Sequence, residues 1–306
     1  MLTTVLRKPR VLIVGCGDIG LRLAALLRPR LRVLALTSSP ERVALLRQAG
    51  IVALRGDLDR IDTLWRLRGL ADRVVMLAPP PARGTTDTRA LHLATVLRSA
   101  MIGAAPRRPG LRILYASTSG VYGDCRGEVV PETRVPKPQT ERARRRLHAE
   151  AQWRALGRVG ARVGVLRVPG IYDAAARSPR ARLRSGLPAL RRQDDVYTNH
   201  IHADDLARVL RLALWRAAPQ RVYNVCDDTR ILAGDYLDLA AACLGEPPPP
   251  RRSREQLAGS ALSPMALSFL SESRRLDNGR MHAELGARLL YADVRSGLLA
   301  RGAGPD

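Results

Sequence analysis

A short apolar strand that runs directly into a glycine-rich turn limits how this chain can fold more than any other feature. Residues 10–20 read Arg-Val-Leu-Ile-Val-Gly-Cys-Gly-Asp-Ile-Gly, so the strand is followed by three glycines at G-x-G-x-x-G spacing. Leucines in residues 21–27 then recur at the spacing of one helical face. A strand, turn and helix of this kind predict a site where the diphosphate of a dinucleotide meets free N–H groups at the start of a helix.

Each glycine has its own expected task in such a turn. Gly15 allows the chain to turn sharply, Gly17 removes a side chain where the pyrophosphate approaches, and Gly20 lets the helix pack close to the strand. The N–H groups of Asp18 and Ile19 are expected to face the same diphosphate. The alternative is an ordinary glycine-rich turn without a ligand, and the flanking strand and helix favour the binding site.

Further apolar runs alternate with helical segments through the first half of the chain. Strands are predicted at residues 32–36, 51–54, 73–77 and 112–116, with a helix at 88–98. This alternation predicts an α/β protein with a Rossmann-like doubly wound parallel sheet. Residues 171–196 and 229–306 lack the same rhythm.

Residues at the carboxyl ends of these strands are expected to contact the cofactor. An NAD-preferring site has Asp or Glu at the end of the second strand, where this chain has Thr37 and Ser38, followed by Arg42. This pattern favours NADP over NAD, although Ser38 could serve either cofactor and Arg42 could be an exposed helix residue. Further contacts are expected at the ends of the next two strands, from Asp57, Leu58, Ala78 and Pro79.

A formal net charge of +23 raises the question of nucleic-acid binding. The basic residues are spread over both halves of the chain, and aromatic residues, which stack on bases, make up only 4% of it. We therefore expect no specific nucleic-acid partner.

The four cysteines form no C-x-x-C pair, so no structural metal site is expected. No run of ~18 apolar residues occurs, which predicts a cytoplasmic protein that does not enter the membrane.

The end of the fifth predicted strand carries a recognisable motif. Residues 117–123 read Ser-Thr-Ser-Gly-Val-Tyr-Gly, which resembles the Ser-Ser-x-x-Val-Tyr-Gly segment of the NAD-dependent epimerase/dehydratase family, the extended short-chain dehydrogenase/reductases. Residues 167–172, 201–205 and 223–225 are similar to the family's Arg-x-x-x-x-Tyr, Ile-His-Val-Asp-Asp and Tyr-Asn-Val segments, and residues 273–278 to its Ser-Lys-Arg-x-x-Asn segment. The resemblance covers nearly the whole chain.

The resemblance implies a division of labour along the chain. Residues 1–170, completed by 197–228, are expected to bind NADP or NAD, with Pro169 among the cofactor contacts. Residues 171–196 and 229–306 are expected to form a small C-terminal lobe that closes over a nucleotide sugar or a similar small molecule. A homodimer is possible.

The catalytic residues depart from the family pattern. The resemblance implies that Thr118 orients the substrate, and that a Tyr and a Lys four residues apart should handle the proton. Counting back from Ala149 and Glu150, those two positions hold Arg142 and Arg146. A guanidinium, with a pKa above ~12, cannot exchange a proton at neutral pH. The usual proton transfer therefore cannot run here.

Several residues could fill or replace the missing role. Tyr122 is a candidate acid, although the family tyrosine at this position is usually structural; Tyr172 and Tyr197 are others. The two arginines lie i, i+4 on one helix face, so they could bind a phosphate or carboxylate, or could be an ordinary solvated surface.

The functional hypotheses are an atypical epimerase, dehydratase or reductase, and a catalytically silent protein that senses dinucleotides or binds a partner.

The segment at residues 199–205 admits two interpretations. His200 and His202 alternate on a predicted strand and so share one face, which would suit a metal pair. The favoured interpretation is the family's linking segment, with Asp204 capping the helix that follows and no metal bound.

Overall fold

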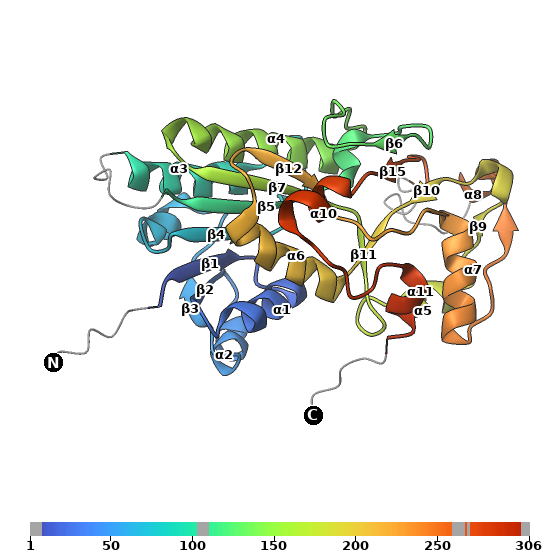
Figure 1. Cartoon of the computed structure of the whole chain (residues 1–306), viewed down its shortest axis with the longest axis horizontal. Coiled ribbons are helices and arrows are strands. Elements are labelled where there is room, and N and C mark those ends of the chain that lie inside the picture. The colour runs from blue at the N-terminus through green and yellow to red at the C-terminus, as the bar shows by residue number, and fades with distance from the viewer. Residues whose placement is uncertain (1–7, 103–109, 259–266, 268–269, 301–306) are drawn as a thin grey trace. The chain divides into compact units, whose positions relative to one another are not determined.

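The computed structural model describes residues 8–102, 110–258, 267 and 270–300. The chain divides into two compact units, each drawn in several colours in Figure 1 because each contains stretches that are distant in sequence. Unit 1 comprises Met1–Ser117, Glu141–Leu166 and Ala207–Tyr223, and unit 2 comprises Thr118–Thr140, Arg167–Leu206 and Asn224–Asp306. The functional boundaries expected from the sequence stay a prediction.

A seven-stranded sheet is the centre of the architecture, with the strand order β12-β7-β5-β4-β1-β2-β3. Its strands are β1 Arg10–Val14, β2 Arg32–Thr37, β3 Val52–Arg55, β4 Arg73–Met76, β5 Arg112–Thr118, β7 Arg162–Val168 and β12 Arg221–Asn224. β1 pairs in parallel with both β2 and β4, so the winding direction reverses beside β1. The predicted doubly wound, Rossmann-like sheet is confirmed. Ligands of such sheets bind at the carboxyl ends of the strands beside this reversal.

Helices cover both faces of the sheet (Figure 1). α1 Asp18–Leu27, α2 Glu41–Gln48 and α6 Ala203–Arg216 lie on one face, and α3 Thr88–Met101 and α4 Glu141–Ala155 on the other. Successive β1 side chains point to opposite faces, because a strand has a period of two. Leu12 and Val14 therefore share a buried cluster with Leu93 of α3 and Trp153 of α4. This packing fixes the end of β1 where the glycine turn begins.

Unit 2 consists of two-stranded pairs and short helices. The pairs are β6 Val129–Val130 with β15 Arg275–Leu276, β8 Gly170–Tyr172 with β11 His200–His202, β9 Ala189–Leu190 with β14 Arg251–Arg252, and β10 Tyr197–Thr198 with β13 Ile231–Leu232. Its helices include α5 Arg180–Arg184, α7 Ala233–Leu244, α8 Arg254–Ala258, α10 Gly279–Leu285 and α11 Val294–Leu298. One face of α7 packs with Tyr172, Leu183 and Leu298.

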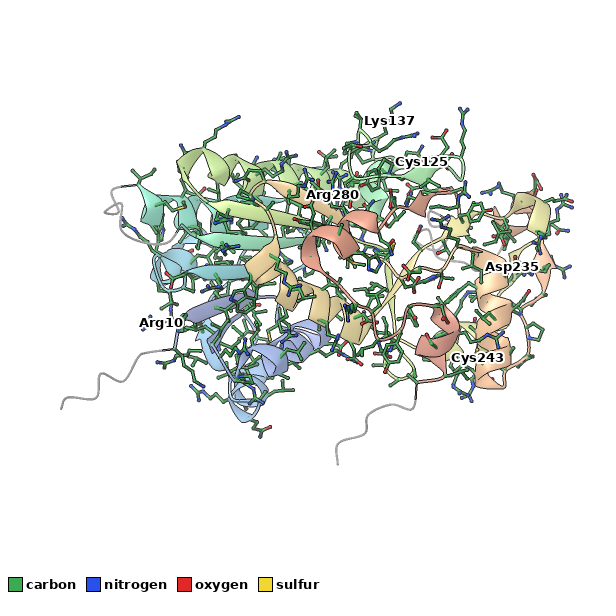
Figure 2. The ribbon with its side chains drawn as sticks, in the orientation of Figure 1. Arg10, Cys125, Lys137, Asp235, Cys243 and Arg280 are labelled. Atoms are coloured by element: carbon green, nitrogen blue, oxygen red, sulfur yellow. The ribbon has the colours of Figure 1, made fainter. Side chains whose placement is uncertain are left out.

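The described residues contain no cluster of three or more His, Cys, Asp and Glu side chains suited to a metal ion. The four cysteines are free thiols; Figure 2 labels Cys125, which follows β5, and Cys243, which lies on α7. Across the same part of the chain, none of the helices is long and apolar enough to cross a membrane.

Candidate functional site

The glycine turn is crowded at its two ends and open in the middle. A Cβ on Gly15, whose φ is +85°, would lie 2.3 Å from the backbone nitrogen of Ala78. A Cβ on Gly20 would lie 3.2 Å from Cys16 Sγ and 3.3 Å from the carbonyl oxygen of Gly15. A Cβ on Gly17, in contrast, would have no atom within 4 Å. The turn therefore has one open approach, at Gly17.

Helix α1 begins at this opening. Gly17 is its N-cap and, having no side chain, leaves the first N–H groups without a side-chain cap. The N–H groups of Asp18 and Ile19 lie in that first turn, while the Asp18 carboxylate pairs with Arg22 at 2.9 Å. The N–H groups at the start of a helix and the positive end of the helix dipole attract an anion. Cys16 is buried in the same turn, and burial raises the pKa of its thiol to about 11. Its side chain is therefore an uncharged part of the packing.

Arg42 of α2 reaches across to the glycine turn. Its Nη2 donates a hydrogen bond of 2.7 Å to the carbonyl oxygen of Cys16. At the end of β2, Thr37 is buried and its Oγ1 accepts from the Ser39 amide at 3.2 Å, whereas Ser38 is exposed. The Ser39 hydroxyl in turn donates to Glu41. A guanidinium thus lies at the glycine turn, and an exposed hydroxyl lies at the carboxyl end of β2.

The loops after β3 and β4 are braced by polar contacts. Asp57 donates its amide to Thr63 Oγ1 at 2.9 Å, and the carbonyl of Leu58 accepts from His92 Nδ1 at 2.8 Å. Ala78 donates its amide to Val14 at 3.0 Å, which ties the β4 loop to the end of β1. Pro79 is exposed, and its carbonyl accepts from Arg89 at 3.3 Å.

The two arginines at the expected Tyr and Lys positions differ in their surroundings. Arg146 Nη1 donates to the carbonyl of Ala116 at 3.0 Å and to the Tyr115 hydroxyl at 3.3 Å, so it reaches the carboxyl end of β5. Arg142 is exposed at the start of α4. Arg145, which the sequence did not single out, is 6% exposed and donates to the carbonyl of Gly84. The most buried arginine of α4 is therefore a structural residue.

A second polar group missed by sequence analysis lies in unit 1 beside Arg146. Asp87 is fully buried and caps α3 by accepting from the Ala90 amide at 2.9 Å, and its own amide donates to His148 Nδ1 at 3.1 Å. Burial raises the pKa of Asp87, and nearby Arg146 counteracts this rise. Its Oδ2 has no hydrogen-bond partner among the described residues. No short motif signals such a group, because its members come from different helices.

The candidate residues Thr118, which ends β5, and Tyr122 belong to unit 2. The side chain of Thr118 accepts from the Gly120 amide at 3.2 Å and is partly exposed. Tyr122 is 1% exposed, and its hydroxyl donates to Asn224 Oδ1 at 2.8 Å. The guanidinium of Arg167 lies 4.6 Å from the centre of its ring. These contacts favour the structural interpretation of Tyr122 over its use as an acid.

Replacing Tyr122 with phenylalanine tests these two roles. The change leaves the buried Asn224 Oδ1 without its donor, so we expect the free energy of unfolding to fall by about 1–3 kcal/mol. Dinucleotide affinity and any turnover should stay at wild-type levels. Chemical denaturation and a rate assay measure the two quantities. A large loss of rate with unchanged stability would instead assign proton transfer to this tyrosine.

The histidines of β11 pack against aromatic rings. His200 stacks on Tyr236 with ring centres 4.1 Å apart, and His202 lies 4.0 Å from Tyr291. Burial lowers the pKa of His200 to about 4, so its imidazole is neutral at pH 7. The predicted capping role of Asp204 is wrong, because this residue lies inside the first turn of α6 and donates its amide to His202 Nδ1 at 3.2 Å.

Unit 2 also contains a cavity of about 320 Å³. Pro169, predicted from the resemblance as a cofactor contact, lines this cavity together with Tyr197, whereas Tyr172 is 2% exposed and its hydroxyl donates to the carbonyl of Asp293 at 3.3 Å. Sequence analysis missed the cavity residues Tyr236 and Leu237, because on α7 they match the apolar pattern of any packed helix.

Comparison with known proteins adds to this geometry. A model of the NAD dependent epimerase/dehydratase family matches residues 11–226. Protein YeeZ of Escherichia coli K12 is 27% identical over 288 residues, which are 93% of this chain and 97% of that protein. A functionally unknown conserved protein from Silicibacter pomeroyi DSS has a similar structure, with a TM-score of 0.78 and 30% identity over 95% of this chain and 96% of that one.

A solved structure with bound ligands has the same fold. MoeE5 in complex with UDP-glucose and NAD superposes with a TM-score of 0.69 and 22% identity, covering 94% of this chain and 96% of MoeE5. At this identity the likeness shows the shared fold. The ligands belong to MoeE5.

Proposed function

Because the chain belongs to the NAD dependent epimerase/dehydratase family, we propose that it binds NADP or NAD at the glycine turn and uses it on a small-molecule alcohol or carbonyl. The open approach at Gly17, beside an α1 N-terminus without a side-chain cap, is the observation that carries this proposal. When bound, the nicotinamide ring supplies hydride acceptance or donation. The chain itself supplies the groups that bind and orient.

The expected binding roles follow the carboxyl ends of the strands of the central sheet. The N–H groups of the first α1 turn bind the diphosphate, and the residues after β2 meet the adenosine ribose. Asp57, Leu58, Ala78 and Pro79 supply loop contacts, and Thr118 orients the substrate. Arg146 replaces a proton-transferring side chain by a permanent cation that already engages the end of β5. It can hold an anionic or carbonyl oxygen in place without exchanging a proton.

We propose NADP as the preferred cofactor, supported by the Arg42 guanidinium beside the turn and the lack of a carboxylate among residues 37–39. Truncating Arg42 to alanine should weaken NADP binding by about 10-fold or more, the scale of one hydrogen bond to a charged group, and affect NAD far less. Calorimetric titration of both cofactors into wild type and variant measures this. Equal losses for both cofactors would mean that Arg42 only braces the turn through Cys16.

The arginines at positions 142 and 146 favour a second candidate, a dinucleotide-binding protein without catalysis. The deciding experiment incubates the protein with NADPH or NADH and a panel of uncharged ketones and aldehydes, and in parallel with NADP or NAD and a panel of UDP-sugars, for which chromatography detects any new product. Loss of NADPH or NADH absorbance would establish an enzyme. Dinucleotide binding in calorimetry without conversion of any panel member would favour the silent protein, and absence of binding would overturn both candidates.

A further inference from the structure

The cavity of unit 2 lies next to the candidate substrate-orienting residue in sequence. Ser119, one residue after Thr118, lines it, as do Pro169 and Gly170, which follow directly after β7. The chain therefore enters this cavity from the carboxyl ends of two strands of the central sheet. Such ends are where ligands of this fold bind.

The arginines that line the cavity are already engaged. Arg274 is 6% exposed, pairs with Glu272 at 2.7 Å and donates to the carbonyl of Gly123 at 2.6 Å. Arg182 donates to the carbonyls of Leu187 and Pro188 at 2.6 and 2.8 Å. A diphosphate entering the cavity would have to compete with these internal partners.

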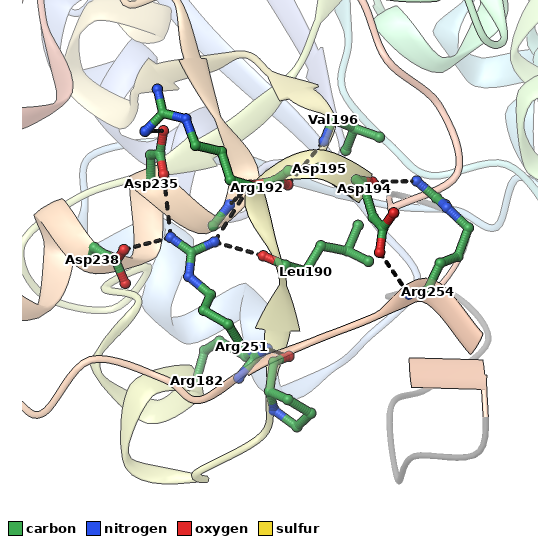
Figure 3. A network of polar contacts seen from close by, with 12 residues as sticks. Arg182, Leu190, Arg192, Asp194, Asp195, Val196, Asp235, Asp238, Arg251 and Arg254 are labelled. Carbon is green, nitrogen blue, oxygen red and sulfur yellow. Dashed lines mark hydrogen bonds and ion pairs between the residues drawn. The ribbon is translucent and has the colours of Figure 1, made fainter. Parts of the chain in front are cut away.

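A third arginine lies directly behind the cavity wall. Arg251 donates to the carbonyl of Leu190, a lining residue, at 2.7 Å (Figure 3). The same guanidinium contacts three carboxylates, those of Asp195 at 3.5 Å, Asp235 at 3.2 Å and Asp238. Asp195 also accepts from the amide of Gly234, another lining residue, at 2.8 Å. Arg192 also pairs with Asp235, at 3.6 Å, so three carboxylates meet two guanidinium groups in this network, although the whole chain carries a charge of +23.

Much of the remaining wall is aromatic or apolar, beside the polar residues Ser119, Thr198 and Asn199. Tyr236 and Leu237 of α7 face the cavity, and His200 is stacked on Tyr236. His200 is 8% exposed, and its Nδ1 has no hydrogen-bond partner among the described residues. The wall therefore combines ring surfaces with an uncharged imidazole.

We infer that this cavity binds an uncharged, largely apolar molecule, with a flat ring or chain against Tyr236 and Leu237, and that it excludes nucleotide diphosphates. Burying a charged group costs several kcal/mol unless a partner compensates it, and each lining cation already has a partner. The inference rests on the proposed function, because it names the class of substrate that the proposed dinucleotide-dependent enzyme would act on. It narrows the substrates to neutral alcohols and carbonyls and sets aside nucleotide sugars.

N-phenyl-1-naphthylamine, an uncharged fluorophore that brightens in apolar sites, is a suitable probe. We expect saturable fluorescence on titration into the full chain, and no displacement by a large excess of UDP or UDP-glucose. Leu237→Arg, which places a charge in the wall, should weaken probe binding about 10-fold or more. Leu290→Arg is the matched control, because Leu290 lies in the same unit and its side chain is 55% exposed.

Three results would overturn the inference: absence of saturable probe binding, displacement of the probe by UDP, or equal probe affinity in the two arginine variants. The displacement test uses the wild-type chain, so it does not depend on how any variant folds, and Leu237→Gln provides a milder second variant. Calorimetry with NADP on the same samples separates the two proposals. Failure of probe binding with intact dinucleotide binding counts against this inference alone, and loss of dinucleotide binding by the wild type counts against the proposed function.

Discussion

Replacing Gly17 with valine is expected to lower the affinity for NADP and NAD about 100-fold or more while the chain stays folded. Gly17 has a φ of −79° and a ψ of −152°, so its φ lies outside the left-handed region that strains residues with a side chain. Its Cβ would meet no protein atom within 4 Å, so the side chain would occupy only the space expected for the diphosphate. Losing two hydrogen bonds to a charged group, at about 1.5 kcal/mol or more each, accounts for the expected factor.

Gly15 supplies the matched comparison within the same turn. Valine at this position would place its Cβ 2.3 Å from the Ala78 nitrogen and would have to adopt a φ of +85°, which a β-branched residue avoids. We expect this variant to fail in folding, whereas Gly17→Val should unfold at nearly the wild-type temperature. Circular dichroism and calorimetry measure the two properties. If Gly17→Val binds dinucleotide as tightly as wild type, the diphosphate does not lie at this turn.

The central sheet was predictable because its signals are local. Four apolar residues before the glycines predict β1, and the structure places that strand at Arg10–Val14. The helix after the turn begins at Asp18, three residues before the leucine pattern starts at Leu21, because the turn itself supplies the first helical residues. The predicted strands 32–36 and 112–116 likewise extend to Thr37 and Thr118.

The buried face of α4 could not be predicted from its sequence. An i, i+4 spacing shows that Arg142 and Arg146 share a face, but four arginines in five residues leave the orientation of the helix open. The structure buries Arg145 because the carbonyl of Gly84, distant in sequence, lies within reach of its guanidinium. The cavity of unit 2 was hidden for a similar reason. Its lining comes from several separate stretches, and although those at residues 117–123, 167–172 and 273–278 match family segments, no local pattern shows that they meet at one cavity.

We expect a second large effect at Asp227, on how the free energy of unfolding depends on pH. This aspartate of unit 2 is 3% exposed, its Oδ1 accepts from the Thr229 amide at 3.0 Å, and its Oδ2 has no partner among the described residues. Burial raises the pKa of its carboxyl from the usual 3.8 to about 8. Between those two values the folded chain holds a proton that the unfolded chain has released.

The sign of the effect follows from this difference in bound protons. Stability falls with rising pH wherever the folded state binds more protons, so the contribution of Asp227 declines from about pH 4 to pH 8 and is flat above. A shift of this size corresponds to a decline on the order of 5 kcal/mol across the window. Asp227→Asn removes the titrating group and keeps the shape of the side chain. We therefore expect the variant to gain stability relative to wild type as pH rises.

Urea unfolding at a series of pH values between 4 and 9 measures this directly. The free energy of unfolding of Asp227→Asn should depend on pH distinctly less than that of wild type. The variant should be the more stable protein at pH 8. Asp62→Asn is the matched control, because the side chain of this aspartate is 64% exposed, and it should keep the wild-type pH dependence. Parallel curves for wild type and Asp227→Asn would mean that Asp227 is ionised in the folded chain, with its buried charge compensated by water or by a group that binds at Oδ2.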